Sequence, residues 1–206
     1  WTDNIGDVSS GGNTPVVEGH MLNEYRYRSV YKGNGKYFNA DGSVNPAGGP
    51  KGGMIRTEED MNWVKAMMDA GYKFKPGNSI GKANIYYGDY IYADVNGDGV
   101  YGDSDDEEFQ GRSKTPKYNF GFQASAAWNG FDISMVWAGA AGFDIYWGPT
   151  AGYNAAKTEW GNNIAQRIAD DHYFYDPSNP DDPRTNINGK YPRMTYLDGN
   201  VQNNAS

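Results

Sequence analysis

Residues that could hold a metal ion lie in a short acidic stretch, DVNGDG, at residues 94–99. Its spacing fits the calcium-loop pattern D-x-[DN]-x-[DN]-G, in which side-chain oxygens occupy positions one, three and five and the glycine makes a sharp turn. A backbone carbonyl serves position seven, and position twelve, usually a bidentate glutamate, is here an aspartate. The sequence therefore predicts a structural Ca²⁺ site with ligands from Asp94, Asn96, Asp98, Val100 and Asp105.

Two alternatives to this ligand set stay open. The shorter aspartate at position twelve makes bidentate closure weaker, and other carboxylates stand beside it: Asp103, Asp106, Glu107 and Glu108. The stretch can also be read as an acidic, solvated turn without an ion. Because the flanking segments show no helical pattern, we expect a Ca²⁺ ion that stabilises the loop and not a calcium sensor with paired helices.

Other residues that could do chemistry give no pattern of a catalytic centre. His20 and His172 are the only histidines, and neither lies in an HExxH motif or near a plausible nucleophile. Cysteine, GxSxG, P-loop and Rossmann glycine motifs are absent, so nothing in the sequence indicates an enzyme. With 18 Lys and Arg against 26 Asp and Glu, the net charge of -8 argues against a nucleic-acid partner.

The composition is polar and aromatic at the same time. The 206 residues include 28 Gly, 17 Tyr and 6 Trp, while the mean hydropathy is -0.80. Tyr and Trp favour boundaries at which one end of the side chain is apolar and the other is wet, which indicates a β protein with extensive interfaces. No apolar run reaches the length of about 18 residues that a transmembrane helix needs, whereas spanning β-strands give a much weaker signal.

Residues 117–141 predict a β-hairpin that turns at Asn129-Gly130, a pair typical of type I′ turns. Every second residue of each arm is apolar, aromatic residues stand at the ends, and the opposite face is small or polar. Each arm, 118–128 and 131–141, is long enough to cross a bilayer when tilted. We therefore predict that one face meets lipid through Tyr118, Phe120, Phe122, Trp128, Phe131, Ile133, Met135 and Trp137. The alternative is a strand pair in a soluble sandwich, with the same face turned toward a core.

The rest of the chain predicts strands separated by long loops. We expect a strand at 17–31, a long loop at 32–85, a strand and the calcium-type loop at 86–110, and a long surface loop at 142–206. A helix is expected at 57–70, with Thr57 as its N-cap and Asp60 completing a capping box. A second helix within 155–171 is a weaker prediction, because Gly161 interrupts it.

Several of these motifs together resemble the C-terminal part of a SusC/RagA-type TonB-dependent outer-membrane transporter. GDYIYADVNGDG at 88–99, PKYNFGF at 116–122 and GFDIS at 130–134 are similar to that family's GDI-Y-DVNGDG, P-x-Y-x-(Y/F)-GF and GF-D-(L/I)-S elements. The motifs EGHMLNEYRY and YPRM also resemble elements of that family. The resemblance as a whole covers roughly residues 15–206. The chain departs from the family at Met21, where proline is usual, at Tyr90, where isoleucine is usual, and in EEFQG, which replaces DR-x-x-(I/L)G.

The resemblance implies a mainly β fold: antiparallel strands of a transmembrane β-barrel with long surface loops and one or two short loop helices, in the bacterial outer membrane. It implies import of glycans or peptides together with a SusD-like surface lipoprotein. The TonB complex would act through a plug domain that, like the final strands, we expect outside this sequence. The expected contacts are therefore an oligosaccharide or peptide substrate and outer-membrane lipid, and no nucleic acid. The alternative is a secreted calcium-containing β-sandwich that binds carbohydrate; a dockerin-like piece is disfavoured because the calcium loop is single.

Overall fold

The computed structural model describes residues 19–21, 24–145 and 165–195, and these divide into two compact units. The hairpin unit takes its described residues from within Trp1–Tyr27 and Phe109–Tyr146, and the core unit takes its own from within Arg28–Glu108 and Trp147–Ser206. Strands outnumber helices, and the longest pairing is antiparallel, as the mainly β prediction requires. The described strands form three two-stranded sheets, and no closed barrel is found among them. No helix in the described ranges is long and apolar enough to cross a membrane.

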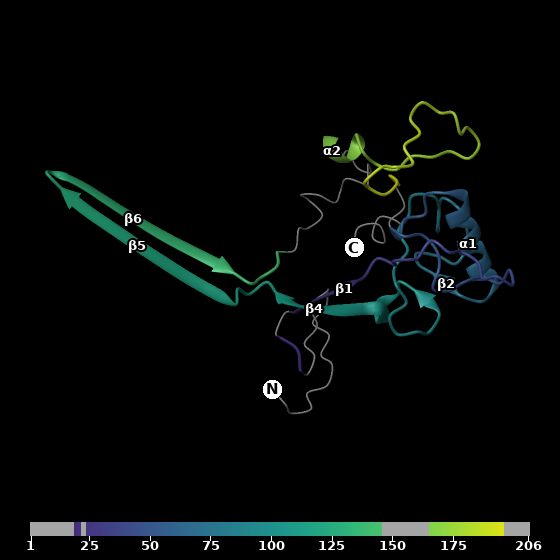
Figure 1. Cartoon of the computed structure of the whole chain (residues 1–206), viewed down its shortest axis with the longest axis horizontal. Coiled ribbons are helices and arrows are strands. Elements are labelled where there is room, and N and C mark those ends of the chain that lie inside the picture. The colour runs from purple at the N-terminus through teal and green to yellow at the C-terminus, as the bar shows by residue number, and fades with distance from the viewer. Residues whose placement is uncertain (1–18, 22–23, 146–164, 196–206) are drawn as a thin grey trace. The chain divides into compact units, whose positions relative to one another are not determined.

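The hairpin unit is dominated by two long strands, β5 (Tyr118–Trp128) and β6 (Phe131–Ala141), which pair along their whole length (Figure 1). Their bounds are those that the alternating pattern predicts. The turn uses Asn129 and Gly130 at φ 49° and 87°, the positive values that a type I′ turn needs and that Asn and Gly accept most readily. A shorter sheet joins β1 (Glu24–Arg28) to β4 (Glu107–Ser113). The strand expected at 17–31 is thus confirmed only at 24–28, and residues 17–18 and 22–23 lie outside the described part.

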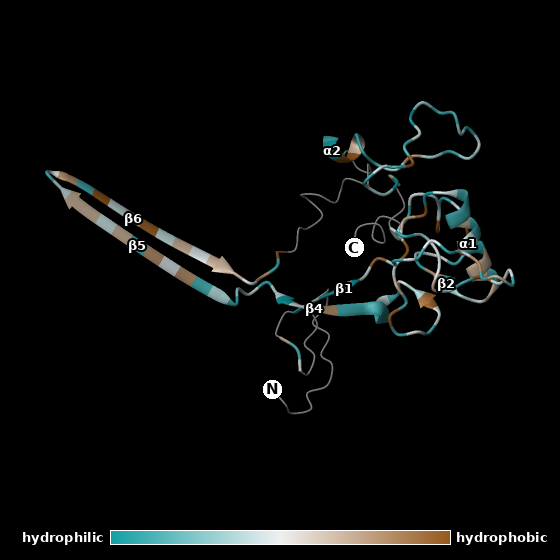
Figure 2. Ribbon diagram, in the orientation of Figure 1, coloured by the Kyte–Doolittle hydropathy of each residue, from teal (hydrophilic) through white to brown (hydrophobic). Residues whose placement is uncertain are grey.

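The register of β5 and β6 separates the side chains into two faces. Directly opposed residues point to the same side of a two-stranded sheet, so the pairs Phe122–Trp137 and Ala126–Ile133 lie on one face. The pairs on the other face are small or polar in most cases, such as Ser125–Ser134. Figure 2 shows the resulting alternation of apolar and polar bands along both strands.

The core unit is organised by the helix α1 (Glu58–Asp69). The Thr57 hydroxyl accepts the Asp60 backbone N–H at 3.2 Å, while the Asp60 carboxylate accepts the Thr57 N–H at 2.9 Å, which is the predicted capping box. One side of α1 buries Trp63, Val64 and Met67 completely. The helix prediction for 57–70 is confirmed, with the first residue serving as the cap.

Apolar residues from irregular segments complete this core. Phe74 in β2 (Lys73–Phe74) and Tyr101 in β3 (Val100–Tyr101) stack with ring centroids 4.9 Å apart, and these short strands pair in parallel. The Trp63 indole N–H donates to the Asn45 carbonyl at 2.9 Å. Residues 32–85, predicted as a long loop, are therefore packed around α1. Widely spaced apolar residues among Gly, Pro and Asn gave no periodic signal of this packing.

Two further predictions differ from the structure. The strand expected from residue 86 to the acidic loop is reduced to isolated bridges at Tyr90 and Tyr92. Residues 165–195, expected as surface loop, include the short helix α2 (Gln166–Ala169) and a fully buried Tyr173. Burial of Tyr173 and contacts such as the Arg193–Asp89 ion pair hold this segment on the core unit with little regular secondary structure. The part of the second predicted helix before residue 165 lies outside the described residues.

Candidate functional sites

The acidic loop at 94–99 is closed by hydrogen bonds from its side chains to its own backbone. The Asp94 carboxylate accepts the N–H groups of Gly97 at 2.7 Å and Gly99 at 2.9 Å. Asn96 and Asp98 repeat the motif on a smaller scale, because each side-chain oxygen accepts the N–H two residues further along. The oxygen-rich sequence thus serves first to satisfy a sharply turning backbone.

A second carboxylate, Asp106, holds the other side of this loop. It is completely buried, and its two oxygens accept the N–H groups of Val95 at 2.7 Å and Gly102 at 2.9 Å. The predicted position-twelve ligand, Asp105, is instead exposed, and its backbone N–H donates to the Asp103 carboxylate at 3.0 Å. The reason is the 3₁₀ turn η1 (Ser104–Asp106), which turns the third of its residues inward.

The described residues contain no cluster of three or more His, Asp or Glu side chains arranged to hold a metal ion. Asp94, Asn96, Asp98 and Val100 are close in sequence, but the structure uses their polar groups for the hydrogen bonds within the loop. Carboxylate, amide and carbonyl oxygens remain the donor set that Ca²⁺ prefers. Calcium binding by this loop therefore stays a prediction.

The predicted lipid-facing residues share one face of the hairpin, and each is substantially exposed. The exposed fraction of these side chains ranges from 46% at Met135 to 77% at Trp128. No other described residues cover this apolar face of the hairpin. It consists of Tyr118, Phe120, Phe122, Trp128, Phe131, Ile133, Met135 and Trp137.

A pocket that the sequence did not predict lies in the core unit. It has a volume of about 500 Å³, and two segments far apart in the chain form its wall. The first contributes Tyr86 and Tyr87, and the second contributes Tyr173, Phe174 and Tyr175. Tyr87 packs edge-on against Tyr86 and against Tyr175, with ring centroids 5.4 and 5.2 Å apart.

A buried ion pair joins the two segments of the pocket. Arg193 donates to both carboxylate oxygens of Asp89 at 2.6 and 2.9 Å, and these side chains are 11% and 0% exposed. Asp89 also accepts the Tyr86 N–H at 2.9 Å, which fixes the backbone beneath the first tyrosine. Gly88 makes the close approach possible, because a Cβ at this position would lie 2.5 Å from the Tyr173 ring.

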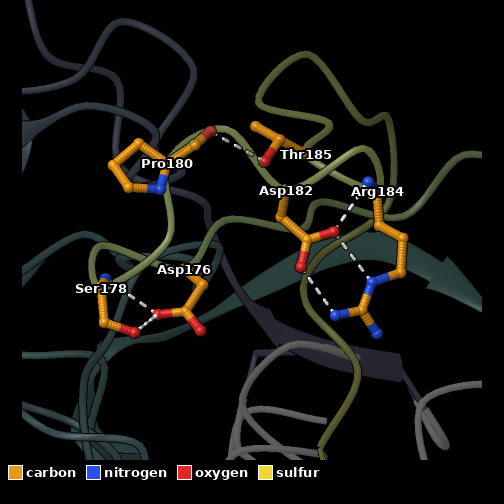
Figure 3. Close-up of polar contacts among 6 residues, drawn as sticks. All are labelled: Asp176, Ser178, Pro180, Asp182, Arg184 and Thr185. Carbon is orange, nitrogen blue, oxygen red and sulfur yellow. Dashed lines mark hydrogen bonds and ion pairs between the residues drawn. The ribbon is translucent and has the colours of Figure 1, made fainter.

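The rim of the pocket is ordered by short-range polar contacts (Figure 3). Asp182 accepts from Arg184 through two side-chain bonds of 2.9 and 2.7 Å, and these bonds lower the pKa of Asp182 to about 2. Asp176 accepts from the Ser178 hydroxyl at 2.7 Å, which lowers the pKa of that carboxyl. Burial raises the pKa values of Tyr86 and Tyr87, so both phenols stay protonated at neutral pH.

The pocket was missed because its two halves are unrelated in sequence. The adjacent pair Tyr86-Tyr87 and the run Tyr173-Phe174-Tyr175 are visible as aromatic clusters. Contacts between residues far apart in the chain bring the two halves together, such as the Asp89–Arg193 pair, 104 residues apart, and the contact of the Tyr87 and Tyr175 rings.

A scan against models of protein families gave no match, and neither did searches of curated proteins and of solved structures.

Proposed function

We propose that this chain is part of an outer-membrane TonB-dependent transporter that imports glycans or peptides together with a SusD-like lipoprotein. The observation that carries this proposal is the uncovered apolar face of the β5–β6 hairpin. Contiguous apolar surface of this kind is rare on soluble monomers and marks contact with a membrane or a partner. The motifs at 88–99 and 116–134, which resemble those of the transporter family, favour contact with a membrane over contact with a soluble partner.

The dimensions of the hairpin support a membrane-spanning role. Each strand has 11 residues. At about 3.4 Å per residue such a strand is roughly 37 Å long, and a tilt of about 40° gives a projection of about 28 Å. That length matches a hydrocarbon layer of about 30 Å. Aromatic residues at both ends, Tyr118 near the open end and Trp128 beside the turn, suit the two interfaces.

The proposal requires further strands at both edges of the hairpin. Backbone N–H and C=O groups in hydrocarbon must all be hydrogen-bonded, so a spanning hairpin needs neighbouring strands that close a barrel. The polar face of β5 and β6 would then line the interior. The alternative, a secreted sandwich, would instead cover Phe122 and Trp137 with a second sheet, whereas these side chains are 60% and 63% exposed.

The core unit would form the ordered surface loops of this transporter. Segments on both sides of the hairpin in sequence contribute to it, and the Asp89–Arg193 pair links them. The acidic loop would bind Ca²⁺ through Asp94, Asn96, Asp98, Val100 and Asp105, while Asp106 holds the loop from its other side through the N–H groups of Val95 and Gly102. The proposed docking of the lipoprotein and the proposed contact with TonB rest on the resemblance to the transporter family.

Two arginine substitutions near the middle of β5 test the proposal. Phe122→Arg places a charge on the apolar face, and Gln123→Arg places the same charge on the polar face one residue away. A charge that faces lipid near the bilayer centre costs about 2–4 kcal/mol, whereas a charge facing the interior does not. We expect Phe122→Arg to reduce strongly the amount of folded protein in the outer membrane and Gln123→Arg to leave it nearly unchanged. Equal effects of the two substitutions would contradict the proposal.

A further inference from the structure

The aromatic pocket has the chemistry of a binding site for a small, uncharged ring. Its volume of about 500 Å³ falls within the usual range for ligand sites. Three half-buried tyrosines, Tyr86, Tyr87 and Tyr175, line it, and Tyr87 stands between the other two. The edge-on packing holds the Tyr86 and Tyr175 rings at angles of 82° and 77° to the Tyr87 ring.

The hydroxyl groups of these tyrosines are available to a ligand. The Tyr173 hydroxyl is used within the fold, because it donates to the Arg56 carbonyl at 2.8 Å. Within the described ranges, the hydroxyls of Tyr86, Tyr87 and Tyr175 make no such bond. A protonated phenol both donates and accepts, so each can pair with a ligand hydroxyl.

Two arginines of the wall are held in ion pairs with carboxylates of the core unit. Arg193 is paired with Asp89, and Arg184 is paired with Asp182. Lys82 and Asp176 also line the pocket and carry opposite charges, and the Lys82 charge helps to lower the pKa of Asp176. The two ion pairs hold the guanidinium groups of Arg193 and Arg184 as positioned hydrogen-bond donors whose charges are already compensated. Arg193 lies over the Tyr86 ring at 5.6 Å, which stiffens that ring further.

We propose that this pocket binds a neutral hexopyranose unit of an oligosaccharide, stacked on Tyr87 and hydrogen-bonded by the hydroxyls of Tyr86 and Tyr175. A pyranose ring has apolar C–H faces and a rim of hydroxyls, which matches rings that carry hydroxyls at their edges. An apolar peptide side chain would leave these hydroxyls unpaired, at a cost in affinity. The inference rests on the proposed function only for the role of the sugar as imported cargo; the binding itself does not depend on membrane insertion.

Binding is measured by isothermal titration calorimetry on the intact protein in detergent. The probes are neutral hexasaccharides of glucose, mannose and galactose, a hexagalacturonate of the same length, and a hexapeptide rich in Leu and Phe. The variants are Tyr87→Ala, Tyr86→Phe and Tyr175→Phe. The matched control is Phe38→Ala, which removes an exposed ring of the core unit that does not line the pocket.

We expect at least one neutral hexasaccharide to bind and the galacturonate to bind at least tenfold more weakly. Removing the Tyr87 ring should weaken binding by about tenfold or more, because it removes stacked apolar surface. Each Tyr→Phe change should weaken it by about fivefold, the usual value of one hydrogen bond. Phe38→Ala should have no effect.

Three outcomes would overturn the inference: no binding of any neutral hexasaccharide, tighter binding of the peptide or the galacturonate, or equal sensitivity to Phe38→Ala and Tyr87→Ala. Sugar binding by a protein whose hairpin fails to meet lipid would instead overturn the proposed function and leave the pocket assignment standing.

Discussion

Single buried carboxylates organise most of the irregular structure in this chain. Asp60, Asp89 and Asp106 are each at most 4% exposed, and each accepts at least one backbone N–H from a turn. Glu24 does the same in the hairpin unit, where it accepts the Gly111 N–H at 2.6 Å. Such bonds replace the regular ladders that a loop lacks. Part of the acidic composition is therefore structural, which a count of charges cannot reveal.

The Asp89–Arg193 pair should matter more to stability than any other ion pair in the described part of the chain. Asp89→Asn removes the charge that compensates a nearly buried guanidinium, and we expect a loss of about 3 kcal/mol in the free energy of unfolding. Denaturant unfolding followed by tyrosine fluorescence measures it. Asp182→Asn is the control, because its bidentate partner Arg184 is 74% exposed and should contribute far less. Similar losses in both variants would show that burial of the pair is not what matters.

At the scale of elements, the sequence predicted what local rules determine. Thr57 and Asp60 define the start of α1, and the alternation around Asn129-Gly130 defines β5 and β6. The packed segments at 32–56 and 172–195 could not be predicted, because distant partners such as Trp63 and Arg56 hold them. The same limit applies to the sites: the turn of the acidic loop is local and could be predicted, although its calcium binding stays a prediction, whereas the aromatic pocket is not local and could not be predicted.

The acidic loop gives a prediction at this scale. Asp106→Ala leaves the N–H groups of Val95 and Gly102 without an acceptor and should cost about 1–3 kcal/mol, whereas Asp105→Ala should cost less than about 0.5 kcal/mol. Thermal unfolding in EDTA compares them. In millimolar Ca²⁺ the wild-type midpoint should rise, because an ion that binds only the folded state stabilises it. An unchanged midpoint would remove calcium from the account, and a larger cost for Asp105→Ala than for Asp106→Ala in EDTA would contradict the role of Asp106 in closing the loop.

For the whole molecule, the two units differ in where their apolar residues lie. The core unit buries its large side chains, with Trp63, Phe74 and Tyr173 at most 2% exposed. The hairpin unit exposes its own, with Phe122 and Trp137 at 60% and 63%. Under the proposed function, the packed core would lie in water and the hairpin would lie in hydrocarbon. Alternation in the sequence predicted which residues share the apolar face of the hairpin, whereas outside α1 no local pattern indicated the packed core.

The most direct measurement is a cysteine scan along β5, which the absence of native cysteine makes clean. Single cysteines at residues 119–127 would carry a nitroxide in the intact protein reconstituted in lipid vesicles. Electron paramagnetic resonance then compares collisions with lipid-soluble oxygen and with a water-soluble nickel chelate. We predict a period of two, with oxygen favoured at Phe120, Phe122, Ala124 and Ala126, and nickel favoured at Gln123 and Ser125. Uniform access of the nickel chelate to all nine positions would contradict a lipid-facing hairpin.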